Sequence, residues 1–250
     1  MTITNEAELD GLKAIGRIVA NTLEIMGRAL APGMTTAELD AIGARALAAA
    51  GARSAPSLAY GFPGATCISV FPEIAHGIPG DRVIAAGDLV NIDVSAEKDG
   101  FYADTGASFV AGGATADAAK LLRDGRRAMW AGIGVAAPGA PLARIGDAIG
   151  AFARKNRYTL IRNLASHGVG RSLHEEPTEI PTWPDRSERR KIGAGQVFTV
   201  EPFLSRGAEW AENVEGDPWA LVADTADATV QFELTIVATP RGPIIITLPG

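Results

Sequence analysis

The sequence contains few cysteine, histidine and aromatic residues. Its 250 residues include one cysteine, Cys67, three histidines and 6% aromatic residues. A single cysteine excludes an internal disulfide and is typical of proteins from a reducing compartment. We therefore expect a fold that is held by its core rather than by cross-links.

Long apolar runs and basic clusters are also missing. No apolar stretch approaches the roughly 20 residues that a membrane span needs, and the polar, acidic segment Met1–Asp10 does not have the pattern of a secretory signal. The net charge of −6 and the absence of a Lys/Arg stripe argue against a nucleic-acid partner. With 47% hydrophobic and 21% charged residues, the composition predicts a globular, cytoplasmic protein without a membrane partner.

The stretch from Leu89 to Val110 has the pattern of a β-hairpin. Apolar and polar residues alternate from Val90 to Ser95, and Glu97-Lys-Asp-Gly100 supplies the turn. A four-residue loop would place Asp93 directly opposite Asp104, with their Cβ atoms roughly 5 Å apart. Like charges at that separation are destabilising unless a cation lies between them. The hairpin is thus a candidate divalent-cation site, and a solvated surface pair is the alternative when it is considered alone.

A second copy of this pattern lies in the other half of the chain. Residues 86–93 (AGDLVNID) and residues 194–201 (AGQVFTVE) share their Ala-Gly start, their order of polar and apolar residues, and their final carboxylate. Asp93 therefore corresponds to Glu201. Further strands downstream carry a second acid each, Asp104 and Glu233.

Upstream segments repeat as well. The sequences Ala-Pro-Gly and Asp-Ala-Ile-Gly-Ala each occur twice, at 31–33 and 137–139 and at 40–44 and 147–151. Such self-similarity predicts an internal duplication. We expect one catalytic domain spanning 1–250, made of halves at about 1–112 and 113–250, with the four acids brought to one point.

Helical periodicity predicts four helices. The first begins after Asn5 and stops at Pro32-Gly33, the second begins after Thr35 and ends at Gly51, and the others span about 116–135 and 142–155. Residues 57–64 are expected to form a loop. The predicted fold class is α+β, a curved antiparallel sheet whose outer face the helices cover and whose inner face is left for chemistry.

Each of the three histidines lies beside glycine or in a glycine-rich segment: His76 precedes Gly77, and His167 and His174 lie within Ser166–Pro177. A lone histidine is more often a packed or exposed side chain than a ligand, but this shared setting makes that explanation weaker. Four carboxylates with at least one imidazole suit Mn(II), Fe(II), Co(II) or catalytic Zn(II) better than structural zinc. Four negative charges are neutralised by two divalent ions.

Two bridged ions would hold a water molecule and lower its pKa toward neutrality. The resulting hydroxide could attack an acyl or phosphoryl group. Histidines outside the metal shell could hydrogen-bond the substrate oxygen where negative charge develops.

The ordered motifs resemble those of the type I methionine aminopeptidases over almost the whole chain. They are His76-Gly, Asn91-Ile-Asp-Val94, Asp99-Gly-Phe-Tyr-Ala-Asp104, His167-Gly-Val-Gly-Arg171, His174-Glu-Glu-Pro177, Thr199-Val-Glu-Pro202 and Gln231-Phe-Glu233. The resemblance implies the pita-bread fold, in which two α/β halves are related by a pseudo-twofold axis. That symmetry agrees with the duplication read from the residues.

The same resemblance implies roles for individual residues. Asp104 and Glu233 would bridge two divalent ions (Co, Mn, Fe(II) or Zn), His167 and Glu201 would complete one shell, and Asp93 would belong to the second, weaker metal. His76 would contact the scissile amide nitrogen or the residue after it, His174 the carbonyl oxygen, and Glu201 would also relay a proton. The reaction would be removal of N-terminal methionine from nascent polypeptides by a monomer, with a ribosome contact left open.

A methionine pocket is implied by the resemblance at four residues: Tyr60, Phe62, Cys67 and Trp219. The alternative for Phe62 and Trp219 is a place in the core. The sequence departs from the family pattern at Pro72, Leu173 and Leu234, and in the segment 206–228. None of these departures removes a metal ligand, but they could alter selectivity.

Two other functions compete with this prediction. The first is an Xaa-Pro aminopeptidase or dipeptidase on the same fold, although those enzymes usually carry a separate N-terminal domain. The second is a non-catalytic module that binds peptides or proteins, although such modules typically lose ligands, whereas all five are present here. A calcium site is disfavoured because calcium prefers oxygen ligands and would not use His167.

Overall fold

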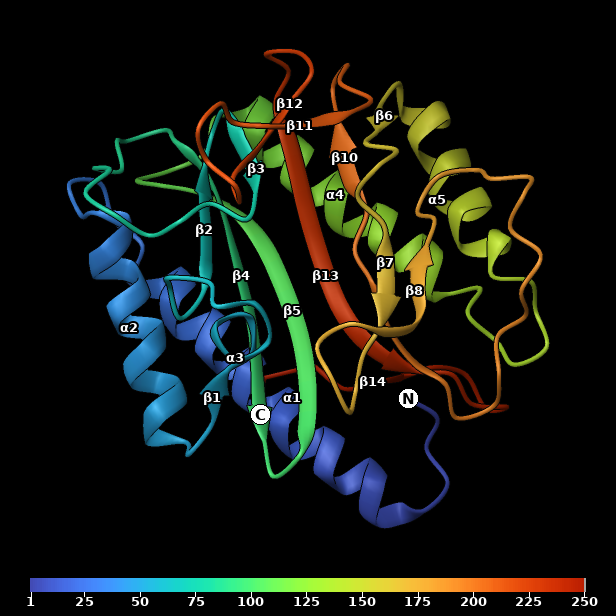
Figure 1. Cartoon of the computed structure of the whole chain (residues 1–250). Coiled ribbons are helices and arrows are strands. Elements are labelled where there is room, and N and C mark those ends of the chain that lie inside the picture. The colour runs from blue at the N-terminus through green and yellow to red at the C-terminus, as the bar shows by residue number, and fades with distance from the viewer. Residues whose placement is uncertain (250) are drawn as a thin grey trace.

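Two pairs of helices pack against one large antiparallel sheet in the computed structural model, which describes residues 1–249 (Figure 1). Helix α1 packs on strands β4 and β5 with α2 beside it, and α4 packs on β13 with α5 beside it. The helices are α1 (Glu6–Ala29), α2 (Thr36–Ala49), α3 (Ala55–Tyr60), α4 (Ala116–Ile133) and α5 (Ala143–Asn156). Among the described residues, no helix combines the length and apolarity that a membrane crossing requires.

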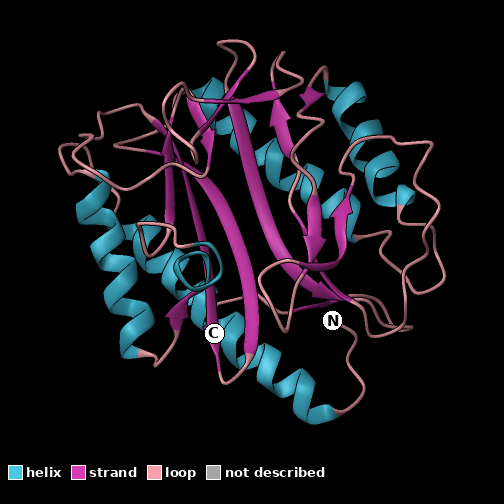
Figure 2. Ribbon diagram, in the orientation of Figure 1, coloured by secondary structure: helices cyan, strands magenta, loops and turns pink. Residues whose placement is uncertain are grey.

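The main sheet has 11 strands with the central order β1-β4-β5-β13-β9-β7-β8, and neighbouring strands in it run antiparallel. Strands β11, β12 and β3 form a separate small sheet. Figure 2 shows the strands as one curved layer with the long helices on one side. The strands are β1 (Arg53–Ser54), β2 (Cys67–Val70), β3 (Glu73–Ala75), β4 (Leu89–Lys98), β5 (Phe101–Val110), β6 (Thr159–Leu160), β7 (Ser166–Gly168), β8 (Glu175–Ile180), β9 (Val197–Val200), β10 (Phe203–Ser205), β11 (Ala211–Asn213), β12 (Leu221–Ala223), β13 (Thr229–Val237) and β14 (Ile244–Ile245).

The helix starts follow the predicted capping residues. The Asn5 side chain accepts a hydrogen bond from the backbone N–H of Glu8, and Thr35 forms a reciprocal capping box with Glu38. Each cap satisfies a backbone N–H that has no partner within its helix. The expectation of a loop over 57–64 was partly wrong, because α3 covers Ala55–Tyr60 and ends at Gly61 in the left-handed conformation.

The central hairpin forms, but its turn is tighter than predicted. Lys98 pairs with Phe101, which leaves a two-residue turn at Asp99 and Gly100, both with positive φ. Asp-Gly is a preferred sequence for such a type I′ turn, whose twist matches that of the strands. The register therefore places Asp93 opposite Gly106, and the prediction that Asp93 lies directly opposite Asp104 was wrong.

The duplication read from the sequence is visible in equivalent backbone contacts. In each half, the glycine of Ala-Pro-Gly donates to the segment before the carboxylate strand, and that segment donates back. The four bonds are Gly33 N to Ile84 O (2.8 Å), Ile84 N to Met34 O (2.8 Å), Gly139 N to Ile192 O (2.7 Å) and Ile192 N to Ala140 O (2.9 Å). Strands β5 and β13 pair at the centre of the sheet, where the two halves meet.

Each helix pair covers its own hydrophobic cluster. The first includes Leu12, Val19 and Ile92, and the second includes Ile145, Ile149 and Phe198, all with at most 1% of their surface exposed. Burying a side chain of this size contributes roughly 1.5–3 kcal/mol. The two clusters hold the convex side of the sheet, so the carboxylates on its other face have a rigid support.

Glycines in the helices allow unusually close packing. The repeated Asp-Ala-Ile-Gly-Ala places Gly43 in contact with Met26 and Gly150 in contact with Pro184, where an added Cβ would lie 2.6 Å and 2.4 Å from the nearest atom. At Gly146 in α5 the neighbour is the backbone itself, since a Cβ would lie 2.1 Å from the carbonyl oxygen of Trp183. Backbone atoms cannot move aside as easily as a side-chain end.

We predict that Gly146→Ala destabilises the fold, although alanine is the better helix former by about 1 kcal/mol. Relieving the clash with Trp183 requires a shift of α5, so the free energy of unfolding should fall by about 1–3 kcal/mol. Gly80→Ala is the control, because the nearest atom to its added Cβ is 4.0 Å away. Urea denaturation measures both, and an equal response of the two variants would contradict the packing argument.

Candidate metal centre and cleft

Four carboxylates project from neighbouring strands toward the same face of the sheet. Gly106 on β5 pairs with Asp93 on β4 and with Glu233 on β13, so these three residues form a row across the sheet. Asp104 lies two residues from Gly106 and therefore shares its face. Glu201 follows β9 directly. Since Gly106 has no side chain, the Gln231 amide can lie over it; an added Cβ would be 2.6 Å from Gln231 Oε1.

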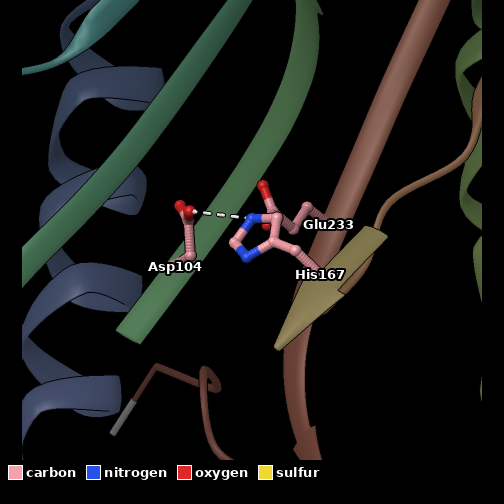
Figure 3. Close-up of side chains that lie close together, drawn as sticks. All are labelled: Asp104, His167 and Glu233. Carbon is pink, nitrogen blue, oxygen red and sulfur yellow. Dashed lines mark ion pairs between the residues drawn. The ribbon is translucent and has the colours of Figure 1, made fainter. Parts of the chain in front are cut away.

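His167 on β7 approaches this group from the second half of the chain. Its Nε2 lies 3.7 Å from Asp104 Oδ2 and 3.4 Å from Glu201 Oε1. Ligand atoms of Asp104, His167 and Glu233 all lie within 4.8 Å of one another (Figure 3). The Nδ1 atom lies 3.1 Å from the Gly168 carbonyl oxygen, to which it can donate. The Nε2 lone pair then faces the carboxylates, as in histidines that bind metals.

Asn91, Gln231 and Thr199 each lie two positions before one of the acids, and they form hydrogen bonds that hold Glu233 and Glu201 in place. Asn91 Nδ2 donates to Gln231 Oε1 (2.8 Å), Gln231 Nε2 donates to Glu233 Oε2 (3.0 Å), and Thr199 Oγ1 donates to Glu201 Oε1 (2.5 Å). These supporting roles were missed from the sequence. Strand periodicity could have found them, because residues i and i+2 share a face.

A cleft of about 640 Å³ opens over the carboxylates. It is lined by every residue predicted to contact substrate and by Leu173; the set is Tyr60, Phe62, Cys67, His76, Leu173, His174 and Trp219. Arg162, Thr178 and Trp183 also line it and were not predicted. The sequence offered no local signal for these three.

The predicted pocket residues differ in their setting. Phe62 is 3% exposed and meets Trp219 edge to face with 5.2 Å between ring centroids, and Cys67 is buried opposite Asp93. The two aromatic rings thus line the cleft, and their place in a methionine pocket stays a prediction. Tyr60 is 51% exposed, and its Oη lies 2.7 Å from Nδ1 of His174.

The three departures from the family pattern do not cluster. Leu173 is buried and lines the cleft, whereas Pro72 is exposed. Leu234 follows Glu233 on β13 and therefore points to the opposite face, where it packs against the second hydrophobic cluster. Of the three, only Leu173 is placed to contact a molecule in the cleft.

Comparison with known proteins identifies the family. Residues 10–240 match metallopeptidase family M24. The chain belongs to this family. It is 46% identical to "Methionine aminopeptidase 2" of Bacillus subtilis over 248 residues, covering 99% of both chains. The resemblance predicted from the motifs is thereby confirmed.

Solved structures confirm the fold of this M24 metallopeptidase. Methionine aminopeptidase from Rickettsia prowazekii superimposes with a TM-score of 0.94 at 33% identity, covering 99% of this chain and 100% of that one. Prolidase from Pyrococcus furiosus gives a TM-score of 0.76 at 18% identity, which shows the shared fold alone. This chain spans 66% of that prolidase. The predicted pita-bread architecture is therefore correct.

The donor set of the M24 chain fits divalent cations. Three buried carboxylate oxygens lack a hydrogen-bond partner within the described residues: Asp93 Oδ1, Asp104 Oδ1 and Glu233 Oε1. Leaving such acceptors unpaired is costly, and they come from acids that face one another. Hard oxygen donors with one imidazole suit divalent first-row metals, so the residues present match the metal centre that the family name implies.

Without a cation the acids oppose each other's ionisation. Burial raises the pKa of Asp93 to about 6, and burial followed by the charge of Glu233 raises the pKa of Asp104 well above its usual range. The pKa values of Glu201 and Glu233 are raised for the same two kinds of cause. Burial lowers the pKa of His167 to about 3, so its imidazole is neutral and available as a ligand at pH 7.

We predict that ionised Asp93 destabilises the metal-free protein. A carboxyl whose pKa is raised from 3.8 to about 6 on folding contributes stability that is present below pH 4 and is lost as the pH rises through 6. Asp93→Asn mimics the protonated acid. The variant should match the wild type near pH 4 and be more stable by up to about 3 kcal/mol at pH 7.5.

Chemical denaturation of metal-stripped protein across pH 4–7.5 measures this difference. Asp99→Asn, in the exposed turn of the same hairpin, is the control and should show no such trend. The idea fails if Asp93→Asn gives the same stability difference at every pH.

Proposed function

We propose that this M24 metallopeptidase removes N-terminal methionine from polypeptides. The observation that carries the proposal is the 46% identity, over 99% of both chains, to a protein named methionine aminopeptidase. The cleft supports it, because an apolar wall of Phe62, Cys67 and Trp219 lies beside the carboxylates. A linear, apolar thioether side chain fits such a wall.

The proposed metal ligands are the five residues predicted from the sequence: Asp93, Asp104, His167, Glu201 and Glu233. Asp104 and Glu233 would be shared by two ions, His167 and Glu201 would bind one of them, and Asp93 would bind the other. When bound, two divalent ions (Co, Mn, Fe(II) or Zn) supply a water of lowered pKa and a Lewis acid for the carbonyl. The four negative charges of the acids match the charge of two such ions.

Other side chains act on the substrate. His174 donates a hydrogen bond to the carbonyl oxygen as negative charge develops on it. Glu201 accepts the proton of the attacking water and passes it on. His76 contacts the scissile amide nitrogen or the residue after it. Partial burial, followed by the charge of His76, lowers the pKa of His174 to about 4, which keeps its imidazole neutral at pH 7.

The chain acts as a single catalytic domain of two halves, about 1–112 and 113–250. We propose that it works in the cytoplasm as a monomer on nascent polypeptides, with a ribosome contact as a further possibility for testing. An Xaa-Pro peptidase and a binding module on the same fold remain the alternatives, and peptide hydrolysis separates all three.

The first test is hydrolysis of Met-Ala-Ser beside Ala-Pro-Ser and Leu-Ala-Ser, with metal-stripped protein reloaded separately with Mn(II), Fe(II), Co(II) and Zn(II). We expect cleavage of the methionine peptide alone, at least about a hundredfold faster after reloading because the metals supply the nucleophile. Cleavage of Ala-Pro-Ser would favour the Xaa-Pro peptidase. Binding of two metals without any cleavage would favour the binding module.

We further predict that His174→Ala lowers kcat roughly a hundredfold or more, as the loss of an oxyanion donor does. Metal affinity, measured by calorimetric titration, should stay within about twofold, because His174 is not among the proposed ligands. Glu176→Gln, an exposed neighbour, is the control. An unchanged kcat in His174→Ala would refute the assigned role.

A further inference from the structure

One hydrogen bond joins the two halves of the molecule across the mouth of the cleft. Tyr60 comes from α3 in the first half and His174 from the loop before β8 in the second, and Tyr60 Oη lies 2.7 Å from His174 Nδ1. Their ring centroids are 5.6 Å apart with the planes inclined by 52°. An exposed tyrosine is thus in specific contact with a histidine that lines the site.

The backbone around Tyr60 is held firmly. Ser57 Oγ lies within hydrogen-bond distance of the carbonyl oxygens of Phe62 (3.0 Å) and Gly64 (2.8 Å), which share its one hydroxyl proton and hold the turn just after the helix. Gly61 ends α3 with φ of 70°, a conformation that favours glycine. Tyr60 is therefore presented from a fixed turn, although its side chain is 51% exposed.

The partner is held as well. Leu173 is buried, and Ser172 Oγ donates to the carbonyl oxygen of His174 (2.9 Å). The His174 ring packs against that of His167, with centroids 4.0 Å apart. In the described part of the chain, Tyr60 Oη is the hydrogen-bond partner recorded for Nδ1. Nε2 is left for a molecule in the cleft.

The chemistry of the pair sets the direction of the bond. A phenol O–H is a stronger acid than the N–H of a neutral imidazole, so it is the better donor. Burial raises the pKa of Tyr60, which keeps its proton in place. A proton donated to Nδ1 requires the imidazole to carry its own proton on Nε2.

We propose that Tyr60 is a positioning residue that holds His174 as the Nε2–H tautomer, ready to donate into the cleft. Tyr60 also lines the cleft, so its place in the methionine pocket stays a prediction beside this role. The kinetic consequence rests on the proposed function, but the tautomer does not. In peptide hydrolysis, negative charge develops on the carbonyl oxygen of the scissile bond. A donor such as His174 Nε2–H stabilises that charge best when it is oriented beforehand.

The decisive test is ¹⁵N NMR of histidine-labelled, zinc-loaded protein at pH 8. Only three histidines contribute signals, and His174→Gln identifies the one of interest. In the wild type we expect a protonated Nε2 and an acceptor-type Nδ1 for His174. In Tyr60→Phe, which keeps the ring, we expect a measurable shift toward the Nδ1–H tautomer.

The matched control is Leu58→Ala, an exposed residue of the same helix that does not line the cleft; it should leave the His174 signals unchanged. Finding Nδ1 protonated in the wild type would overturn the proposal, and so would identical His174 shifts in Tyr60→Phe and the wild type.

Kinetics add a second readout. On a methionine peptide, Tyr60→Phe should lower kcat about fivefold to tenfold, the usual effect of one lost hydrogen bond, with KM changed less than about twofold. Tyr60→Phe with wild-type kcat would count against the positioning role. If the wild type cuts no peptide while its His174 tautomer depends on Tyr60, the proposed function fails and the hydrogen-bond assignment stands.

Discussion

Mutual repulsion among buried carboxylates is the constraint on which this structure depends. Asp93, Asp104, Glu201 and Glu233 are brought to one point although burial raises the pKa of all four, and the charges of neighbouring acids raise those of Asp104, Glu201 and Glu233 further. Unpaired buried charges cost several kcal/mol each, and the metal-free fold must bear that cost or protonate the acids. The two helix-covered hydrophobic clusters on the other side of the sheet supply the opposing stability.

The order of strands in the sheet determines how these acids are arranged. Because β5 and β13 are neighbours, acids from the two halves lie side by side, and Gly106, which has no side chain, leaves room for the Gln231 amide that donates to Glu233. Amide and hydroxyl groups from Asn91, Gln231 and Thr199 fix some carboxylate oxygens and leave others unpaired toward the centre. Fixed outer contacts of this kind orient ligands and tune a bound metal.

Strand alternation and the internal repeat were enough to predict which acids would share a face. They could not predict the register, because the segment from Glu97 to Gly100 can be a four-residue loop or a two-residue turn, and the Asp99-Gly100 signal for the tighter turn was overlooked. The error shifted Asp93 by two positions and so kept it on the correct face. The short helix α3 has only six residues, too few for helical periodicity to show. The contact between Tyr60 and His174 joins residues 114 positions apart, for which local sequence carries no pattern.

The position of β13 has a consequence for how the enzyme comes into being. It is the last long strand of the chain, yet it lies between β5 and β9 at the middle of the sheet. Until it is synthesised, the edge of β5 that faces the second half has no partner strand, and Glu233 is missing from the centre. Pairings between such distant segments form late and slowly. A chain translated only as far as β12 therefore lacks both Glu233 and the strand that joins the two halves of the sheet.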